Sequence, residues 1–198
     1  MTNPLVHLSV LLTETVQAVL ADVDGIYVDA TFGRGGHSRA LLATLGSNAR
    51  LLAFDKDPEA INAGEKLMAE DNRFTIIHAS FADLAQVLTE RDLVGKVDGI
   101  MADLGVSSPQ LDDASRGFSF MNDGPLDMRM NPQQGVSAAD WLVTVSEEDL
   151  ANVLFQYGEE KFSRRIARAI KKEVEIAPIT STKKLSDIVA EAHPSWER

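Results

Sequence analysis

Four short runs of aliphatic and β-branched residues stand out in the hydrophobic pattern of the chain. They cover residues 26–31, 50–55, 74–79 and 97–104, and helical patterns fill the gaps between them. Near-continuous apolar strands that alternate with helices are typical of a parallel sheet covered on both faces. The pattern therefore predicts an α/β fold with a Rossmann-like, doubly wound parallel sheet, preceded by a helix near residues 9–20.

The pattern changes after about residue 105. A long segment rich in Gly, Pro, Ser, Asp and Met is followed by helical patterns only, near residues 137–144, 146–157, 159–174 and 182–192. Long loops inside compact proteins are usually functional. We therefore expect three parts: a core with the cofactor site over residues 1–106, an active-site loop over residues 107–136, and a helical substrate-recognition domain over residues 137–198.

Composition narrows the class of protein. The 198 residues are 44% hydrophobic and 25% charged, as in an ordinary globular protein. No apolar run reaches the length of a transmembrane helix, and no membrane partner is expected. The absence of cysteine excludes disulfides and thiolate zinc sites, and fits the cytoplasm. The four histidines have no metal-ligand spacing, so no metal is predicted, and the net charge of −11 disfavours indiscriminate binding of nucleic acid.

The stretch "DATFGRGGH", residues 29–37, follows the first predicted strand. In open α/β sheets ligands bind at this edge, beyond the carboxyl ends of the strands. Gly33, Gly35 and Gly36 allow positive φ and a close approach of the backbone to a ligand. Gly33 and Gly35 match the dinucleotide fingerprint, but its last position is Ser38, and no P-loop is present.

Acidic residues lie at or near the carboxyl ends of three of the four predicted strands: Asp29, Asp55 and Asp103. Asp55 follows Gly33 by 22 residues, where an acid characteristically accepts ribose hydroxyls. Such carboxylates suit a ligand with a ribose, positive charge and no phosphate, so S-adenosylmethionine fits better than NAD. The alternative is that the acids cap helices and the glycines serve tight turns. Phe81 could stack on an adenine or be an ordinary core aromatic, and His37 could contact a ligand or only begin a helix.

Together with this turn, the stretch "DLGVSSPQLDDASRGFSFMNDGPLDMRM" closely resembles the bacterial RsmH (MraW) family, the 16S rRNA cytosine-N4 methyltransferases. "HLSVLLTETV" and "YGEEKFSRRIARAI" also match, and the resemblance covers residues 5–193. It implies S-adenosylmethionine as cofactor and a cytidine in the decoding region of small-subunit rRNA, free or in the 30S particle, as substrate. It leaves a homodimer open, and it implies that the family continues beyond the end of this chain. The resemblance and the turn assign the cofactor to Gly33, Gly35, Gly36, His37, Asp55, Phe81, Asp103 and Gln110; Gln110 comes from the family only.

Two further roles follow from the expected chemistry. Asp103 could accept the proton lost by the cytosine amine, or it could serve cofactor binding only. Basic residues of "KFSRRIARAIKK" share one helical arc that could follow a phosphate backbone, or be a solvated surface balanced by Glu159 and Glu160. The arc holds Lys161, Arg164, Arg165, Arg168, Lys171 and Lys172, of which Lys161, Arg165, Arg168 and Lys172 are the RNA-binding candidates. The rival functions are an S-adenosylmethionine-binding protein with another substrate, a catalytically silent RNA-binding or assembly module, and a generic nucleotide-binding domain.

Overall fold

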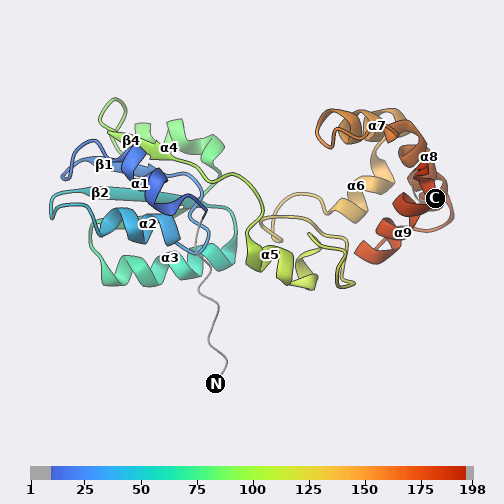
Figure 1. Ribbon diagram of the computed structural model, residues 1–198, viewed down its shortest axis with the longest axis horizontal. Coiled ribbons are helices and arrows are strands. Elements are labelled where there is room, and N and C mark those ends of the chain that lie inside the picture. Colours follow the sequence, from blue (N-terminus) through green and yellow to red (C-terminus); the bar gives the residue numbers. More distant parts are fainter. Residues whose placement is uncertain (1–9, 195–198) are drawn as a thin grey trace, which may run out of the picture. The chain divides into compact units, whose positions relative to one another are not determined.

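The computed structural model describes residues 10–194 of the chain. The chain divides into two compact units, Met1–Gly105 and Val106–Arg198 (Figure 1). The first unit holds a sheet and its covering helices, and the second is helical. No helix within residues 10–194 is long and apolar enough to cross a membrane.

The sheet of the first unit has four parallel strands in the order β3-β2-β1-β4. The strands are β1 Ile26–Asp29, β2 Arg50–Asp55, β3 Phe74–His78 and β4 Gly99–Met101. This confirms the predicted parallel α/β sheet, although β4 is shorter than its apolar run. Asp29 pairs in register with Ala53 of β2 and with Met101 of β4, so the carboxyl ends of these strands meet at one edge.

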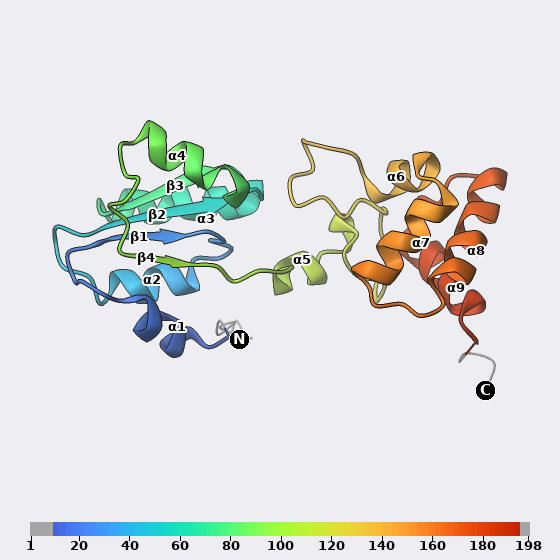
Figure 2. The ribbon, with the colours of Figure 1, turned by 90° about the horizontal axis from the view of Figure 1, so that it is seen from above.

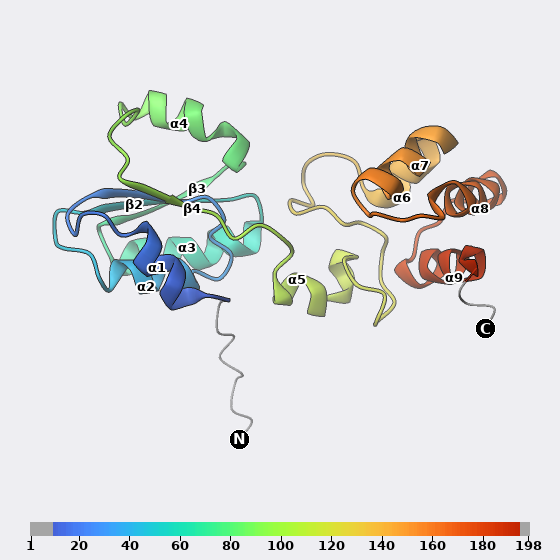
Figure 3. The same cartoon turned by 45° about the horizontal axis from the view of Figure 1, so that its top comes forward.

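Helices cover both faces of this sheet. They are α1 Leu12–Val19, α2 Gly36–Leu42, α3 Pro58–Glu70 and α4 Leu84–Glu90, with a 3₁₀ turn, η1, at Phe81–Asp83. Figure 3 shows α1, α2 and α3 on one side of the sheet and α4 on the other. Side chains alternate along a strand, so Leu51 and Ala53 join the core under α2 and α3, while Leu52 and Phe54 join the core under α4.

The second unit packs its helices around an apolar core. Its elements are α5 Ser108–Asp112, η2 Ala114–Arg116, α6 Ala138–Thr144, α7 Glu147–Gln156, α8 Ser163–Ile176 and α9 Thr182–Ala192. In Figure 2, α7 and α9 lie beside α8, whose Ile166 and Ile170 are buried in that core. The four helices predicted after residue 137 are confirmed. However, α8 begins at Ser163 rather than near residue 159, because Glu159 adopts a φ of 52°, outside the helical region.

Candidate cofactor-binding site

Asp55, the last residue of β2, holds the glycine turn that follows β1. Its Oδ2 accepts the backbone N–H of Gly33 at 2.8 Å, and its Oδ1 accepts the N–H of Asp57 at 2.9 Å. A carboxylate has about four acceptor positions, so each oxygen can accept a further hydrogen bond. The side chain is half-buried at the edge where the strands end, and it can therefore serve the turn and a ligand together.

The two glycines of the fingerprint have different surroundings. Both adopt left-handed backbone, with φ of 56° at Gly33 and 78° at Gly35. A Cβ at Gly35 would lie 2.6 Å from the ring of Phe32, so this glycine is needed for internal packing. A Cβ at Gly33 would meet no heavy atom within 4 Å, so here the backbone faces open space that a ligand can occupy. Gly36 is the first residue of α2.

Asp29 is not available to a ligand in this structure. Its Oδ2 accepts the hydroxyl of Ser38 at 2.7 Å, and its Oδ1 accepts the N–H of Thr31 at 3.1 Å. The side chain is buried, and burial raises the pKa of its carboxyl above the ordinary value despite these two hydrogen bonds. The expectation that three strand-end carboxylates face the ligand was therefore wrong for Asp29. Ser38, the residue that departs from the dinucleotide fingerprint, is the one that hydrogen-bonds the Asp29 carboxylate.

Asp103 and Phe81 are both accessible. Asp103 follows β4, and its backbone N–H donates to Thr31 Oγ1 at 2.7 Å. Its carboxylate makes no hydrogen bond or ion pair with residues 10–194, so it is free to accept one from a ligand. Phe81 begins η1, just beyond β3, and is 50% exposed, which excludes the alternative of an ordinary core aromatic.

His37 and Gln110 have local partners. His37 is buried in α2, with Nε2 at 3.2 Å from the carbonyl oxygen of Val10. Gln110 belongs to the second unit, where its side-chain oxygen accepts the N–H of Ser107 at 2.9 Å and closes a capping box at the start of α5. Their predicted contacts with a cofactor stay predictions. In the described part of the chain, no three His, Asp or Glu side chains form a group that could hold a metal ion.

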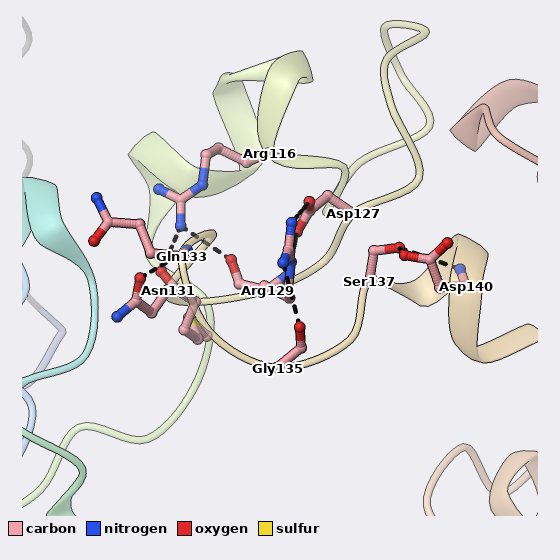
Figure 4. A network of polar contacts seen from close by, with 9 residues as sticks. Arg116, Asp127, Arg129, Asn131, Gln133, Gly135, Ser137 and Asp140 are labelled. Atoms are coloured by element: carbon pink, nitrogen blue, oxygen red, sulfur yellow. Dashed lines mark hydrogen bonds and ion pairs between the residues drawn. The ribbon is translucent and has the colours of Figure 1, made fainter.

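The long loop contains an ordered polar network that the sequence did not predict (Figure 4). The Arg116 guanidinium is buried, and its Nη2 donates to the carbonyl oxygens of Arg129 at 3.2 Å and Met130 at 2.8 Å. Arg129 in turn donates to both carboxylate oxygens of Asp127, at 2.9 and 2.6 Å, which lowers the pKa of that carboxyl. A signal was present in the Asp-x-Arg spacing of residues 127–129, a short-range pairing inside a segment without regular structure.

The basic residues near α8 do not all share one role. Lys171 donates to the carbonyl oxygens of Leu142, Val143 and Val145, at the end of α6, so it belongs to the internal structure of the unit. Its place on an exposed basic arc was wrong. The four RNA-binding candidates are exposed: Lys161, Arg165, Arg168 and Lys172. Arg168 also forms an ion pair with Glu147 at 3.5 Å.

Comparisons with known proteins identify the family. A model of the MraW methylase family matches residues 4–198. The chain is 61% identical over 193 residues to ribosomal RNA small subunit methyltransferase H of Acinetobacter baumannii, covering 97% of this chain and 62% of that protein. The namesakes from a Marinomonas species and from Acinetobacter baylyi are 59% and 58% identical, over 97% of this chain and 61% and 62% of theirs. The chain thus spans about three fifths of the length of these relatives, and it belongs to the MraW methylase family.

Proposed function

We propose that this chain provides the S-adenosylmethionine site of a cytoplasmic enzyme that methylates N4 of a cytidine in the decoding region of 16S, small-subunit rRNA. The name of the relatives, which refers to small-subunit ribosomal RNA, supports the substrate class. The assignment of the cofactor rests chiefly on one observation: the Asp55 carboxylate accepts the Gly33 N–H of the glycine turn and can still accept hydrogen bonds from a ligand.

The residues at the strand ends suit this cofactor. Asp55 can accept the two ribose hydroxyls, and the open space at Gly33 admits the ligand close to the backbone. The exposed ring of Phe81 is available to stack on the adenine. Arg34, the basic residue of the turn, forms an ion pair with Glu59. A pyrophosphate would compete with Glu59 for the Arg34 guanidinium, whereas a cofactor without phosphate would leave this ion pair intact. Gly35, Gly36, His37 and Gln110 complete the proposed set.

S-adenosylmethionine, when bound, supplies a methyl group activated by its sulfonium. The exocyclic amine of cytosine is a weak nucleophile, because its lone pair is delocalised into the ring. The free carboxylate of Asp103 would accept one N–H of this amine, direct the lone pair, and take the proton that is lost. The alternative, that Asp103 only binds the cofactor, is separated by whether Asp103→Asn loses methyl transfer or cofactor affinity.

The exposed basic residues of the second unit are the proposed RNA contacts: Lys161, Arg165, Arg168 and Lys172. The ion pair between Arg168 and Glu147 does not prevent this role. Both side chains are largely exposed, and such pairs contribute only about 0–1 kcal/mol, so a phosphate can replace the carboxylate.

Calorimetry of S-adenosylmethionine binding to this chain tests the cofactor site. We expect saturable binding that Asp55→Ala abolishes and that Glu65→Ala, a charge-matched change at an exposed position of α3, preserves. Equal binding by both variants would overturn the role of Asp55. A folded chain that binds nothing would contradict a site formed by these residues alone.

Transfer of a labelled methyl group to small-subunit particles or to free small-subunit RNA tests the reaction. Digestion to nucleosides should yield N4-methylcytidine. Another labelled product would support the rival with a different substrate. Salt-sensitive RNA binding without transfer would support the silent binding or assembly module.

A further inference from the structure

A polar cavity of about 390 Å³ opens where β2 and β3 begin. Its polar lining residues are Ser47, Arg50, Asn72, Arg73, Thr75 and Arg91. The buried side chains of Leu52 and Leu93, which belong to the core under α4, form its apolar part. A strand advances about 3.3 Å per residue, so Arg50 lies roughly 16 Å along β2 from Asp55. The cavity is therefore separate from the candidate cofactor site.

The charge of this cavity is opposite to that of the chain. The chain has 30 acidic and 19 basic residues, yet three arginines and no carboxylate line the cavity. The acidic residues next to these arginines in the sequence already have partners. Asp71 accepts from Arg73, Glu90 accepts from Gln86, and Asp92 accepts from Lys96.

Most hydrogen-bond donors in the lining are exposed and have no acceptor among the described residues of the protein. Within residues 10–194, the side chains of Arg50 and Arg91 make no hydrogen bond or ion pair, and neither do those of Ser47, Asn72 and Thr75. Arg73 differs, because it is fixed by Asp71 and by the carbonyl oxygens of Leu45 and Gly46. Guanidinium, hydroxyl and amide donors around one polar cavity suit an anion with several oxygens, and arginine pairs well with phosphate.

We propose that this cavity binds a phosphate group of an RNA backbone. A volume of about 390 Å³ is in the range of small-ligand sites, enough for a phosphate and its adjoining sugar. Arg50 and Arg91 supply the positive charge, the fixed Arg73 forms part of the wall, and the hydroxyls and the amide donate hydrogen bonds to the remaining phosphate oxygens. The choice of RNA as the source of the phosphate rests on the proposed function; the binding of phosphate itself does not.

Titration with inorganic phosphate, followed by amide NMR, tests the cavity directly. We expect saturable shifts at residues 47–50, 72–75 and 91, lost in the double variant Arg50→Gln/Arg91→Gln. The matched control, Arg39→Gln/Lys66→Gln, removes two exposed cations from α2 and α3, which cover the other face of the sheet, and should keep these shifts. Absence of saturable shifts in the unchanged chain, or their persistence in the double variant, would overturn the phosphate site.

Fluorescence anisotropy with a single-stranded oligoribonucleotide tests the source of the phosphate. Arg50→Gln/Arg91→Gln should weaken RNA binding about tenfold. It should also make the fall of log affinity with log salt shallower, by about 1 in the slope. If phosphate titrates the cavity but the double variant binds RNA normally, the ligand is a free phosphate and RNA is excluded. If the unchanged chain binds no RNA, the RNA part of the proposed function fails as well, whereas the phosphate titration still decides the cavity. Unchanged S-adenosylmethionine binding in the double variant would show that the two sites are distinct.

Discussion

The Ser38 hydroxyl donates a 2.7 Å hydrogen bond to the Asp29 carboxylate, and both side chains are almost completely buried. This contact joins the first turn of α2, of which Ser38 is the third residue, to the end of β1. It fixes the two sides of the glycine turn to one another. The turn can then present Gly33 and Asp55 in a constant arrangement, which is what a preorganised ligand site requires.

Replacement of Ser38 by alanine should destabilise the first unit. The change leaves a buried carboxylate oxygen without its donor, which typically costs about 1–3 kcal/mol. We expect that decrease in the free energy of unfolding, measured by urea titration of the amide signals of β1 and β2. Ser47→Ala, at an exposed position of the same unit, should stay within about 0.5 kcal/mol of the unchanged chain. Equal effects of the two changes would show that the bond contributes no stability.

Replacement of Asp29 by asparagine should change the pH dependence of stability. Burial raises the pKa of Asp29 above its ordinary 3.8, so the folded state keeps a proton that the unfolded chain has lost. The stabilisation of the folded state by this bound proton is complete below pH 3.8 and is lost as pH rises through the folded-state pKa of Asp29. Asparagine can still accept from Thr31 and donate to Ser38, but it does not titrate. The free energy of unfolding of the variant, minus that of the unchanged chain, should therefore rise with pH above 3.8 and then become constant; a flat difference would contradict this.

Alanine substitutions at Gly33 and Gly35 should separate ligand binding from packing. Gly33→Ala should lower the free energy of unfolding only by the strain of an alanine in left-handed backbone, about 1–2 kcal/mol. Gly35→Ala adds the contact of its Cβ with the Phe32 ring, about 1–3 kcal/mol more. Thermal unfolding should rank them in this order. Calorimetry should find that Gly33→Ala, despite the smaller loss of stability, weakens S-adenosylmethionine binding, because its methyl group occupies the open space. Unchanged affinity would place the ligand elsewhere.

The neighbouring lysines of α8 should respond oppositely to substitution. Lys171→Met removes the charged donor from three carbonyl oxygens at the end of α6 and should cost about 1–2 kcal/mol of stability. Lys172→Met, at an exposed position, should leave stability unchanged and weaken RNA binding. Urea unfolding and anisotropy with an oligoribonucleotide measure the two effects. RNA affinity that is unaffected by Lys172→Met would remove this residue from the proposed interface.

Arg116→Met should loosen the long loop. The methionine keeps apolar volume but removes the donors to the carbonyl oxygens of Arg129 and Met130, at a cost of about 1–3 kcal/mol. Hydrogen exchange should become faster at Met128, whose N–H is bonded to the Arg116 carbonyl, and at nearby amides. Arg164→Met, at an exposed position of α8, is the control. Unchanged exchange in Arg116→Met would mean that the loop holds its shape without the guanidinium.

Local sequence was sufficient for the secondary structure and for the edge of the sheet that carries the site. The alternation of apolar strands and helical patterns predicted the parallel sheet, since strands covered on both faces must be apolar throughout. The glycine turn and Asp55 could be related by their spacing alone, because the ends of adjacent parallel strands meet at one edge. The observed helix starts also obey local rules, because the side chains of Ser137, Ser146 and Ser181 cap α6, α7 and α9.

What each polar side chain does depended on tertiary contacts. Asp29, Asp55 and Asp103 look equivalent in the sequence, but only burial and the hydroxyl of Ser38 make Asp29 internal. Lys171 and Lys172 are neighbours, yet only the helix that packs against α8 decides which of them has carbonyl partners. Periodicity reports which positions face the core, because burial of apolar surface follows the repeat of the element. Periodicity does not show which distant backbone group or carboxylate a polar side chain will contact. The packing of the elements decides that pairing. The pairing in turn decides which charged side chains are structural and which are free to bind a ligand.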